Sequence, residues 1–130
     1  MKKRNGFTLV ELLAVIVILA IILVIAVPQI MSTIDNARLG AFRSTAKLLV
    51  SQAEKQYLVE QTLGSTITTQ YADKAACSNL AKLDGNYSDC NITVDSNGAA
   101  TVKLTGSGKF ASYTCGTGAT SSTIDTACKK

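Results

Sequence analysis

Residues 2–30 read KKRNGFTLVELLAVIVILAIILVIAVPQI, a basic stub followed by an apolar stretch that decides the fold. From Leu12 to Val27 the chain carries no polar or charged side chain. A helix over residues 7–27 would be about 31 Å long, which is enough to cross the hydrocarbon core of a bilayer. The sequence therefore predicts one membrane-spanning helix close to the N-terminus.

The charges on either side of this stretch predict its orientation. Lys2, Lys3 and Arg4 precede it, and the next cation after it is Arg38. Because positive residues flank the cytoplasmic side of a span, we expect the N-terminus inside the cell and the C-terminus outside. A secretory signal peptide is the alternative, but its apolar region is shorter and ends in a small-residue cleavage site, which the ending IAVPQ does not provide. We therefore expect the segment to be retained.

Glu11 is the acidic residue inside this apolar segment. A carboxylate near the centre of a membrane helix costs about 2.5 to 3.5 kcal/mol and less towards its edge. A retained carboxylate at this position therefore needs a partner.

The order of a basic stub, Gly6, Phe7, Glu11, a long apolar run and Pro28 resembles the class III signal and N-terminal helix of type IV prepilins. Pseudopilins of type II secretion and competence pilins share this segment. The resemblance implies that a prepilin peptidase cuts between Gly6 and Phe7, that Phe7 becomes the N-methylated terminus, that Glu11 is the assembly carboxylate and that Pro28 marks a helix kink. One departure is that residues 7–39 contain no glycine, which puts local melting of the helix in a fibre in doubt.

The helix is predicted to continue well beyond the membrane. Apolar residues recur there at intervals of three and four, the spacing of one helix face: Leu39, Phe42, Ala46, Leu49, Ala53 and Tyr57. The helix should end near Leu63, with Gly64 as its C′ residue, and should bend at Pro28. We expect the apolar face to pack against the rest of the chain.

Residues 64–130 are rich in Ser, Thr, Gly and Asn, which favours short strands and turns. We expect a short helix over 71–83, then strands at 91–95 and 99–105 that flank the turn residues Asn97-Gly98. A third strand is predicted at 109–115, with Ala111, Tyr113 and Cys115 facing inward. Residues 116–130 lack periodicity and should be ordered only if they are tied down. The expected fold is α+β and type IV pilin-like, with a long N-terminal helix packed against a small antiparallel sheet.

Four cysteines in the external part allow three pairings. We favour Cys77 with Cys90 and Cys115 with Cys128, because the two loops are of equal length and the second bridge would pin the tail to the last strand. Pilins commonly close their C-terminal loop with such a bridge, so the resemblance implies the same choice. A zinc site is the alternative, but the spacing contains no C-x-x-C and the chain has no His.

The sequence offers little other chemistry. A chain without His is an unpromising candidate for most metalloenzymes and for Ser-His or Cys-His hydrolases. Asp95-Ser-Asn-Gly98 slightly resembles the start of a calcium loop, but it lacks further ligands and reads better as a β-turn. A small basic patch for DNA is a weaker alternative, because no aromatic residues are interleaved with it and two of its residues are terminal: Lys103, Lys109, Lys129 and Lys130. We predict no catalytic residue, cofactor or metal.

Three segments are expected: a leader peptide at 1–6, a transmembrane and assembly half of the helix at 7–31, and a globular head at 32–130. The resemblance implies a structural subunit, the major pilin of a bacterial type IV pilus-like filament used in motility, adhesion or DNA uptake. Its partners would be further copies of itself, prepilin peptidase, the pilus assembly machinery and, before assembly, membrane lipid. It would be stored in the cytoplasmic membrane and displayed in a cell-surface filament. The alternatives are a minor pilin, a type II secretion pseudopilin, or a membrane-anchored adhesin or binding module that does not polymerise.

Overall fold

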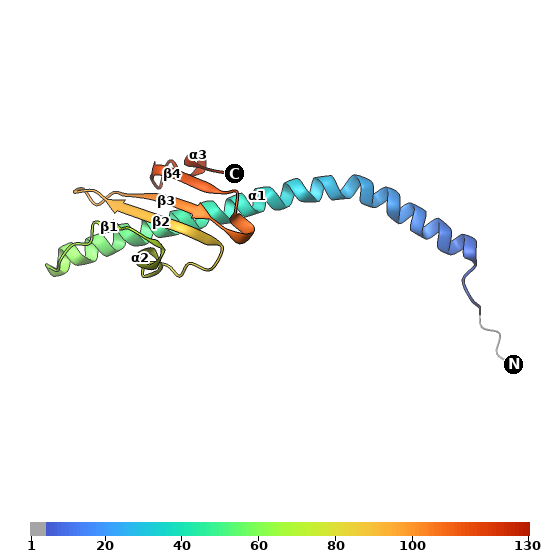
Figure 1. Ribbon diagram of the computed structural model, residues 1–130, viewed down its shortest axis with the longest axis horizontal. Coiled ribbons are helices and arrows are strands. Elements are labelled where there is room, and N and C mark those ends of the chain that lie inside the picture. The colour runs from blue at the N-terminus through green and yellow to red at the C-terminus, as the bar shows by residue number, and fades with distance from the viewer. Residues whose placement is uncertain (1–4) are drawn as a thin grey trace. The chain divides into compact units, whose positions relative to one another are not determined.

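The computed structural model describes residues 5–130, which form helices and one antiparallel sheet (Figure 1). The expected leader cations Lys2, Lys3 and Arg4 lie outside the described residues. The chain divides into two compact units, with the division between Asn36 and Ala37. We call the second unit, Ala37–Lys130, the head.

The helix α1 (Leu9–Leu63) begins in the first unit and ends in the head. After it come, in chain order, β1 (Gln70–Tyr71), α2 (Lys74–Ser78), β2 (Tyr87–Val94), β3 (Ala100–Gly106), the 3-10 helix η1 (Gly108–Phe110), β4 (Thr114–Ala119), α3 (Ile124–Ala127) and β5 (Cys128–Lys129). The helix starts two residues later than predicted and ends where predicted.

In the first unit, α1 presents apolar side chains on all sides. Every described side chain before Asp35 is exposed except that of Ala26, which is partly buried. Within residues 5–130, α1 alone is long and apolar enough to cross a membrane. Exposing this much apolar surface to water is unfavourable, so the first unit needs an apolar environment around it. Pro28 lies inside the continuous helix, and the bend there stays a prediction.

In the head, one face of α1 is buried, as the spacing of its apolar residues predicts. The six buried residues are Phe42, Ala46, Leu49, Val50, Ala53 and Tyr57, and Leu39 packs beside them. All but Val50 belong to the predicted stripe. Most polar and charged residues of α1 in the head lie outside this buried face, although Leu48 and Leu58 are exposed, so the helix changes from predominantly apolar to amphipathic along its length.

The helix ends in a Schellman motif around Gly64, the predicted C′ residue. Gly64 adopts a φ of +66°, in the left-handed region where a side chain would be strained. Its N–H donates to the carbonyl of Gln61, and the N–H of Ser65 donates to the carbonyl of Glu60 at 3.0 Å. These two bonds satisfy carbonyls that the end of a helix leaves open.

The sheet has five antiparallel strands in the order β1-β2-β3-β4-β5. Its central hairpin is the predicted one, with Val94 opposite Ala100 and Gly98 in the connecting turn at φ +84°. The inward residues alternate along β2 and β3 and are buried: Ile92, Val94, Ala100, Val102 and Leu104. They form one hydrophobic core with the buried face of α1.

Polar side chains of α1 add attachments to the backbone of the sheet hairpin. The Glu54 carboxylate accepts from the N–H of Ala100 at 3.2 Å, and the Tyr57 hydroxyl donates to the carbonyl of Ser96 at 3.0 Å. These bonds fix the hairpin along the helix, in addition to the apolar packing beneath it.

The third strand is displaced from its predicted position. Residues 108–110 form η1, and the strand β4 begins only at Thr114, so the prediction of a strand over 109–115 with Ala111 inward was wrong. Ala111 is exposed, whereas Phe110 and Tyr113 are both buried. Two aromatic residues three positions apart cannot share one face of a strand, so a turn of helix is required to bring both into the core.

Two further segments also differ from the expectation. The helix predicted over 71–83 is shortened to α2, and Tyr71 instead belongs to β1. Residues 116–130 are ordered as most of β4, α3 and β5, and Ile124 within them is fully buried. The sequence of residues 116–130 shows no apolar periodicity because each of these short elements contributes only one or two residues to the core.

We expect Phe42→Ala to destabilise the head by about 3 to 5 kcal/mol, because Phe42 is fully buried and its removal leaves a cavity. Its ring centroid lies 5.6 Å from that of Phe110, 5.8 Å from that of Tyr87 and 6.0 Å from that of Tyr113. Thermal unfolding of the detergent-solubilised chain, followed by tyrosine near-ultraviolet circular dichroism, measures the loss. Leu48→Ala on the exposed side of the same helix is the control and should change stability by about 0.5 kcal/mol or less. Equal losses in the two variants would contradict the assigned core.

Candidate functional site

The start of α1 gathers the residues that the sequence analysis singled out for processing and assembly. Asn5 to Thr8 precede the helix in extended or irregular backbone, and the Phe7 side chain is 90% exposed. A Cβ atom added to Gly6 would meet no atom within 4 Å, and Gly6 has no positive φ. Within residues 5–130, no packing contact therefore requires a glycine at position 6.

Glu11 and Thr8 bind each other through a capping box. The backbone N–H of Thr8 donates to Oε2 of Glu11 at 3.0 Å, and the backbone N–H of Glu11 donates to Oγ1 of Thr8 at 3.2 Å. The first intrahelical bond runs from the N–H of Leu12 to the carbonyl of Thr8 at 3.2 Å. Two backbone donors at the helix start are satisfied in this way.

The capping box gives Glu11 a partner inside its own chain. A carboxylate in an apolar segment needs a partner, and Thr8 is the partner in this structure. The signal was present, since Thr8-Leu-Val-Glu11 matches the S/T-x-x-E pattern that marks a helix start. The carboxylate also lies in the first turn, where the positive end of the helix dipole favours negative charge.

The structure joins Cys77 to Cys90 and Cys115 to Cys128, the two pairs that the sequence analysis favours. All four cysteine residues are buried. The first bridge ties α2 to β2, and the second ties β5 to β4.

The C-terminal segment has a second attachment, on the side of α1. Nε and Nη2 of Arg43 both donate to the backbone carbonyl of Cys128, at 3.1 and 3.0 Å. Lys47, one turn further along, forms an ion pair with Asp125 at 2.9 Å. This surface ion pair contributes little by itself, whereas the paired donation from Arg43 sets the position of the last strand. Neither contact could be read from the sequence.

The candidate calcium loop is a turn. Oδ1 of Asp95 accepts from the N–H groups of Asn97 and Ala99, at 2.8 and 3.0 Å, and so is engaged in shaping the hairpin. Within residues 5–130, no three His, Cys, Asp or Glu side chains come close enough to hold a metal ion.

The basic residues considered for DNA binding are distributed over separate elements. Lys103 lies on β3 and Lys129 on β5, with β4 between the two strands. The ammonium group of Lys109 lies 5.1 Å from the ring centroid of Phe110 in η1, in a cation–π contact. This arrangement does not favour a continuous nucleic-acid surface.

A comparison with known families matches residues 1–27 to the prokaryotic N-terminal methylation motif. No curated protein and no solved structure matches the chain. The match covers the basic stub, the capping box and the apolar helix up to the residue before Pro28. It supports the resemblance on which the sequence analysis relied.

We expect Thr8→Val to weaken the start of α1 by about 1 kcal/mol, because it removes the hydroxyl that accepts from the N–H of Glu11. Hydrogen exchange of the Glu11 amide should then speed up several-fold in detergent micelles. Thr8→Ser keeps the hydroxyl and is the matched control, for which we expect exchange close to that of the wild type. Unchanged exchange in Thr8→Val would show that the capping box does not hold the helix start.

Proposed function

We propose that this chain, whose N-terminal methylation motif, long helix and antiparallel sheet are typical of type IV pilin-like proteins, is the repeating structural subunit of a type IV pilus-like filament. The observation that carries the proposal is the exposed apolar surface of α1 in the first unit, with the carboxylate of Glu11 at its start. The role is structural and needs no catalytic group.

The apolar surface of the first unit must be covered both before and after assembly. Before assembly, lipid covers it, with the N-terminus in the cytoplasm and the head outside. In the filament, the same surface packs against other copies of the chain. Because the contacting surfaces of two copies differ, the association is heterologous and does not close, which generates a fibre.

Processing at Gly6 is the first step in this scheme. Since nothing in the chain itself needs a glycine at position 6, we infer that a prepilin peptidase requires it, and that a side chain there would obstruct the cleavage site. The peptide bond between Gly6 and Phe7 lies outside any helix or strand and beside an exposed side chain, so it is accessible to the enzyme. Cleavage leaves the capping box intact, because Thr8 and Glu11 both remain.

We expect the chain recovered from assembled filaments to begin at Phe7, with a methyl group on its amine. Mass spectrometry of the N-terminal peptide measures both features. Gly6→Leu should block cleavage and leave full-length chain in the membrane, whereas Asn5→Ala leaves the glycine in place and should be processed normally. Filaments built from chains that start at Met1 would refute the processing step.

Glu11 is proposed to set the register between neighbouring copies. Cleavage creates a positive amine at Phe7, close in sequence to the Glu11 carboxylate. One oxygen of that carboxylate, Oε2, accepts from Thr8, and a carboxylate has about four acceptor positions. The carboxylate can therefore cap its own helix and bind the amine of the copy placed before it.

The pairing of this carboxylate with an amine matters because both groups lie in apolar surroundings once the fibre forms. Removing one member of a buried ion pair typically costs about 3 to 5 kcal/mol, since the remaining charge is left without a partner. Apolar packing would hold the helices together at many registers, and the charge pair selects one of them.

We expect Glu11→Val to leave membrane insertion and cleavage unchanged but to reduce the number of filaments sharply, as counted by electron microscopy of the cell surface. Glu11→Gln is the matched control for the cap, because an amide oxygen still accepts from the N–H of Thr8 while the charge is lost. If assembly needs the charge, both variants fail; if it needs only the cap, Glu11→Gln assembles. Normal filament numbers in Glu11→Val would exclude the proposed role.

A further inference from the structure

Both outer edges of the sheet in the head are closed in the same manner. The edge of β2 is covered by the two-residue strand β1, and the edge of β4 by the two-residue strand β5. A short helix adjoins each covering strand, α2 after β1 and α3 before β5. One disulfide then ties each covering segment to the strand that it covers.

The edge of β2 is the longer of the two. β2 runs from Tyr87 to Val94, but β1 pairs only with Ile92 and Thr93, and the carbonyl of Thr69 accepts from the N–H of Val94 at 2.8 Å. Within residues 5–130, no other strand pairs with β2 on this side. An exposed edge of this length is a template for pairing with another chain.

The segment that lies over this edge is the connection from Gly64 to Asn86, which we call the edge cover. Its attachments to the sheet include the bridge from Cys77 to Cys90, the two residue pairs of β1 and the bond from the N–H of Val94 to the carbonyl of Thr69. At its C-terminal end, the carbonyl of Asn86 accepts from the N–H of Ser107 at 2.7 Å. Tyr71, Cys77 and Leu83 are its buried side chains, and they close the core beside β2. The edge cover therefore contributes to the core only at widely spaced points.

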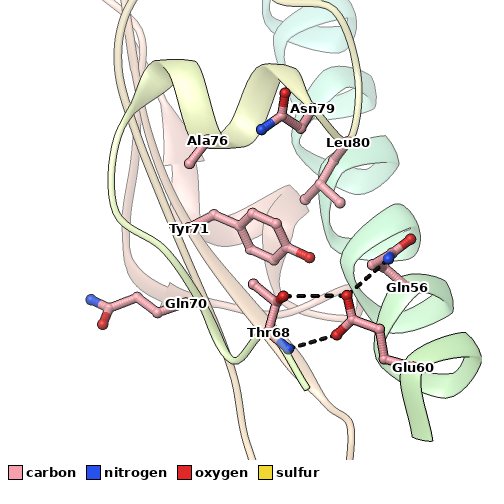
Figure 2. Close-up of a pocket in the computed structure, with 8 residues that line it drawn as sticks. All are labelled: Gln56, Glu60, Thr68, Gln70, Tyr71, Ala76, Asn79 and Leu80. Atoms are coloured by element: carbon pink, nitrogen blue, oxygen red, sulfur yellow. Dashed lines mark hydrogen bonds between the residues drawn. The ribbon is translucent and has the colours of Figure 1, made fainter. Parts of the chain in front are cut away.

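Between these points the edge cover does not pack closely against α1. A cleft of about 350 Å3 separates them, lined by Gln56 and Glu60 of α1 and, from the edge cover, by residues that include Tyr71, Asn79 and Leu80 (Figure 2). The close-up shows the Gln70 side chain pointing away from the helix, so it gives no further attachment there (Figure 2).

Glu60 holds the edge cover to the helix across this cleft. Its carboxylate accepts from the N–H of Thr68 through Oε2, at 2.6 Å, and from the Thr68 hydroxyl and Nε2 of Gln56 through Oε1, at 3.2 and 2.8 Å. The bond from the backbone of Thr68, followed by that from Gln56, holds the pKa of Glu60 below its ordinary value. This attachment is therefore present at neutral pH and is lost only as the pH falls through that lowered pKa.

We propose that the edge cover is a guard that keeps the β2 edge from pairing with a second copy of this chain, and that the Cys77–Cys90 bridge and the hydrogen bonds from Thr68 to Glu60 are both needed to keep it closed. Self-pairing of β2 in the antiparallel direction would be isologous, since each copy would offer the same edge to the other. Membrane storage and filament assembly both bring many heads close together, which makes an open edge a hazard. The edge cover would prevent pairing of β2 between copies whether or not the copies assemble through α1.

The two bridges provide a matched experiment, because both have a sequence separation of 13 and so close loops of equal length in the unfolded chain. The full chain in detergent micelles is compared as wild type, as Cys77→Ala with Cys90→Ala, and as Cys115→Ala with Cys128→Ala. A photo-cross-linking residue at the exposed position 88 of β2 reports pairing between copies. Hydrogen exchange reports which amides open.

In the variant without the first bridge, the amides of residues 69–71 and that of Val94, which donates to Thr69, should exchange about tenfold faster, while those of Val102 and Leu104 in β3 change little. Position 88 should then cross-link to β2 of another copy. The variant without the second bridge should give no such cross-link. Equal loss of protection in β2 and β3, an open β2 edge without cross-links, or the same cross-links in both bridge variants would each overturn the proposal.

If the first bridge variant does not fold, Glu60→Ala decides the question, because it loosens the edge cover from α1 and leaves both disulfides in place. Faster exchange confined to residues 68–71, with cross-linking at position 88 above the wild-type level, supports the guard. Cross-linking at the wild-type level overturns it.

Discussion

The buried face of α1 between Phe42 and Tyr57 is the surface on which the rest of the head depends. A single amphipathic helix in water gains little by itself, because most helical stability in proteins comes from packing the apolar face. The sheet supplies that packing with the inward residues of β2 and β3, and the aromatic residues near Phe42 extend it towards η1. Order in every other part of the head follows from contact with this face or with the sheet that covers it.

The core made in this way is small, and its outer parts need covalent support. Segments such as α2 and α3 are too short to be stable as isolated helices, and β1 and β5 have two residues each. A disulfide holds α2 through Cys77 and β5 through Cys128, and each bridge restricts the unfolded chain and places a buried cystine in the core. A small domain with a limited core typically depends on disulfides for this reason.

The sequence predicted the features that repeat along the chain and missed those that depend on single contacts. The apolar run, the stripe from Leu39 to Tyr57, the end of the helix at Leu63 and the hairpin at Asn97-Gly98 all have periodic or turn signals, and the structure confirms them. The displaced third strand had no such signal, because Phe110 and Tyr113 could not both satisfy a strand pattern.

At the candidate site, the sequence indicated Gly6, Phe7 and Glu11 but not the partner of the carboxylate. Thr8 and Glu11 match the capping-box pattern. The free-energy cost of a carboxylate in a membrane predicts that Glu11 has a partner, but it does not identify which residue that is. The contact of Arg43 with Cys128 joins positions far apart in the chain, and no local pattern could reveal it. The roles of Gly6, Phe7 and Glu11 in processing and assembly rest on the proposal.

Three attachments between α1 and the rest of the head share one chemical property: the side chain comes from the helix, and the group that it binds is backbone. Glu54 accepts from the N–H of Ala100, Tyr57 donates to the carbonyl of Ser96, and Arg43 donates to the carbonyl of Cys128. A backbone group is the same whichever residue carries it, so a change of side chain at exposed Ser96 leaves its bond to Tyr57 available. At these three positions the helix side chain places the segment that it binds, so the exposed side chain of Ser96 can change without loosening the hairpin from the helix.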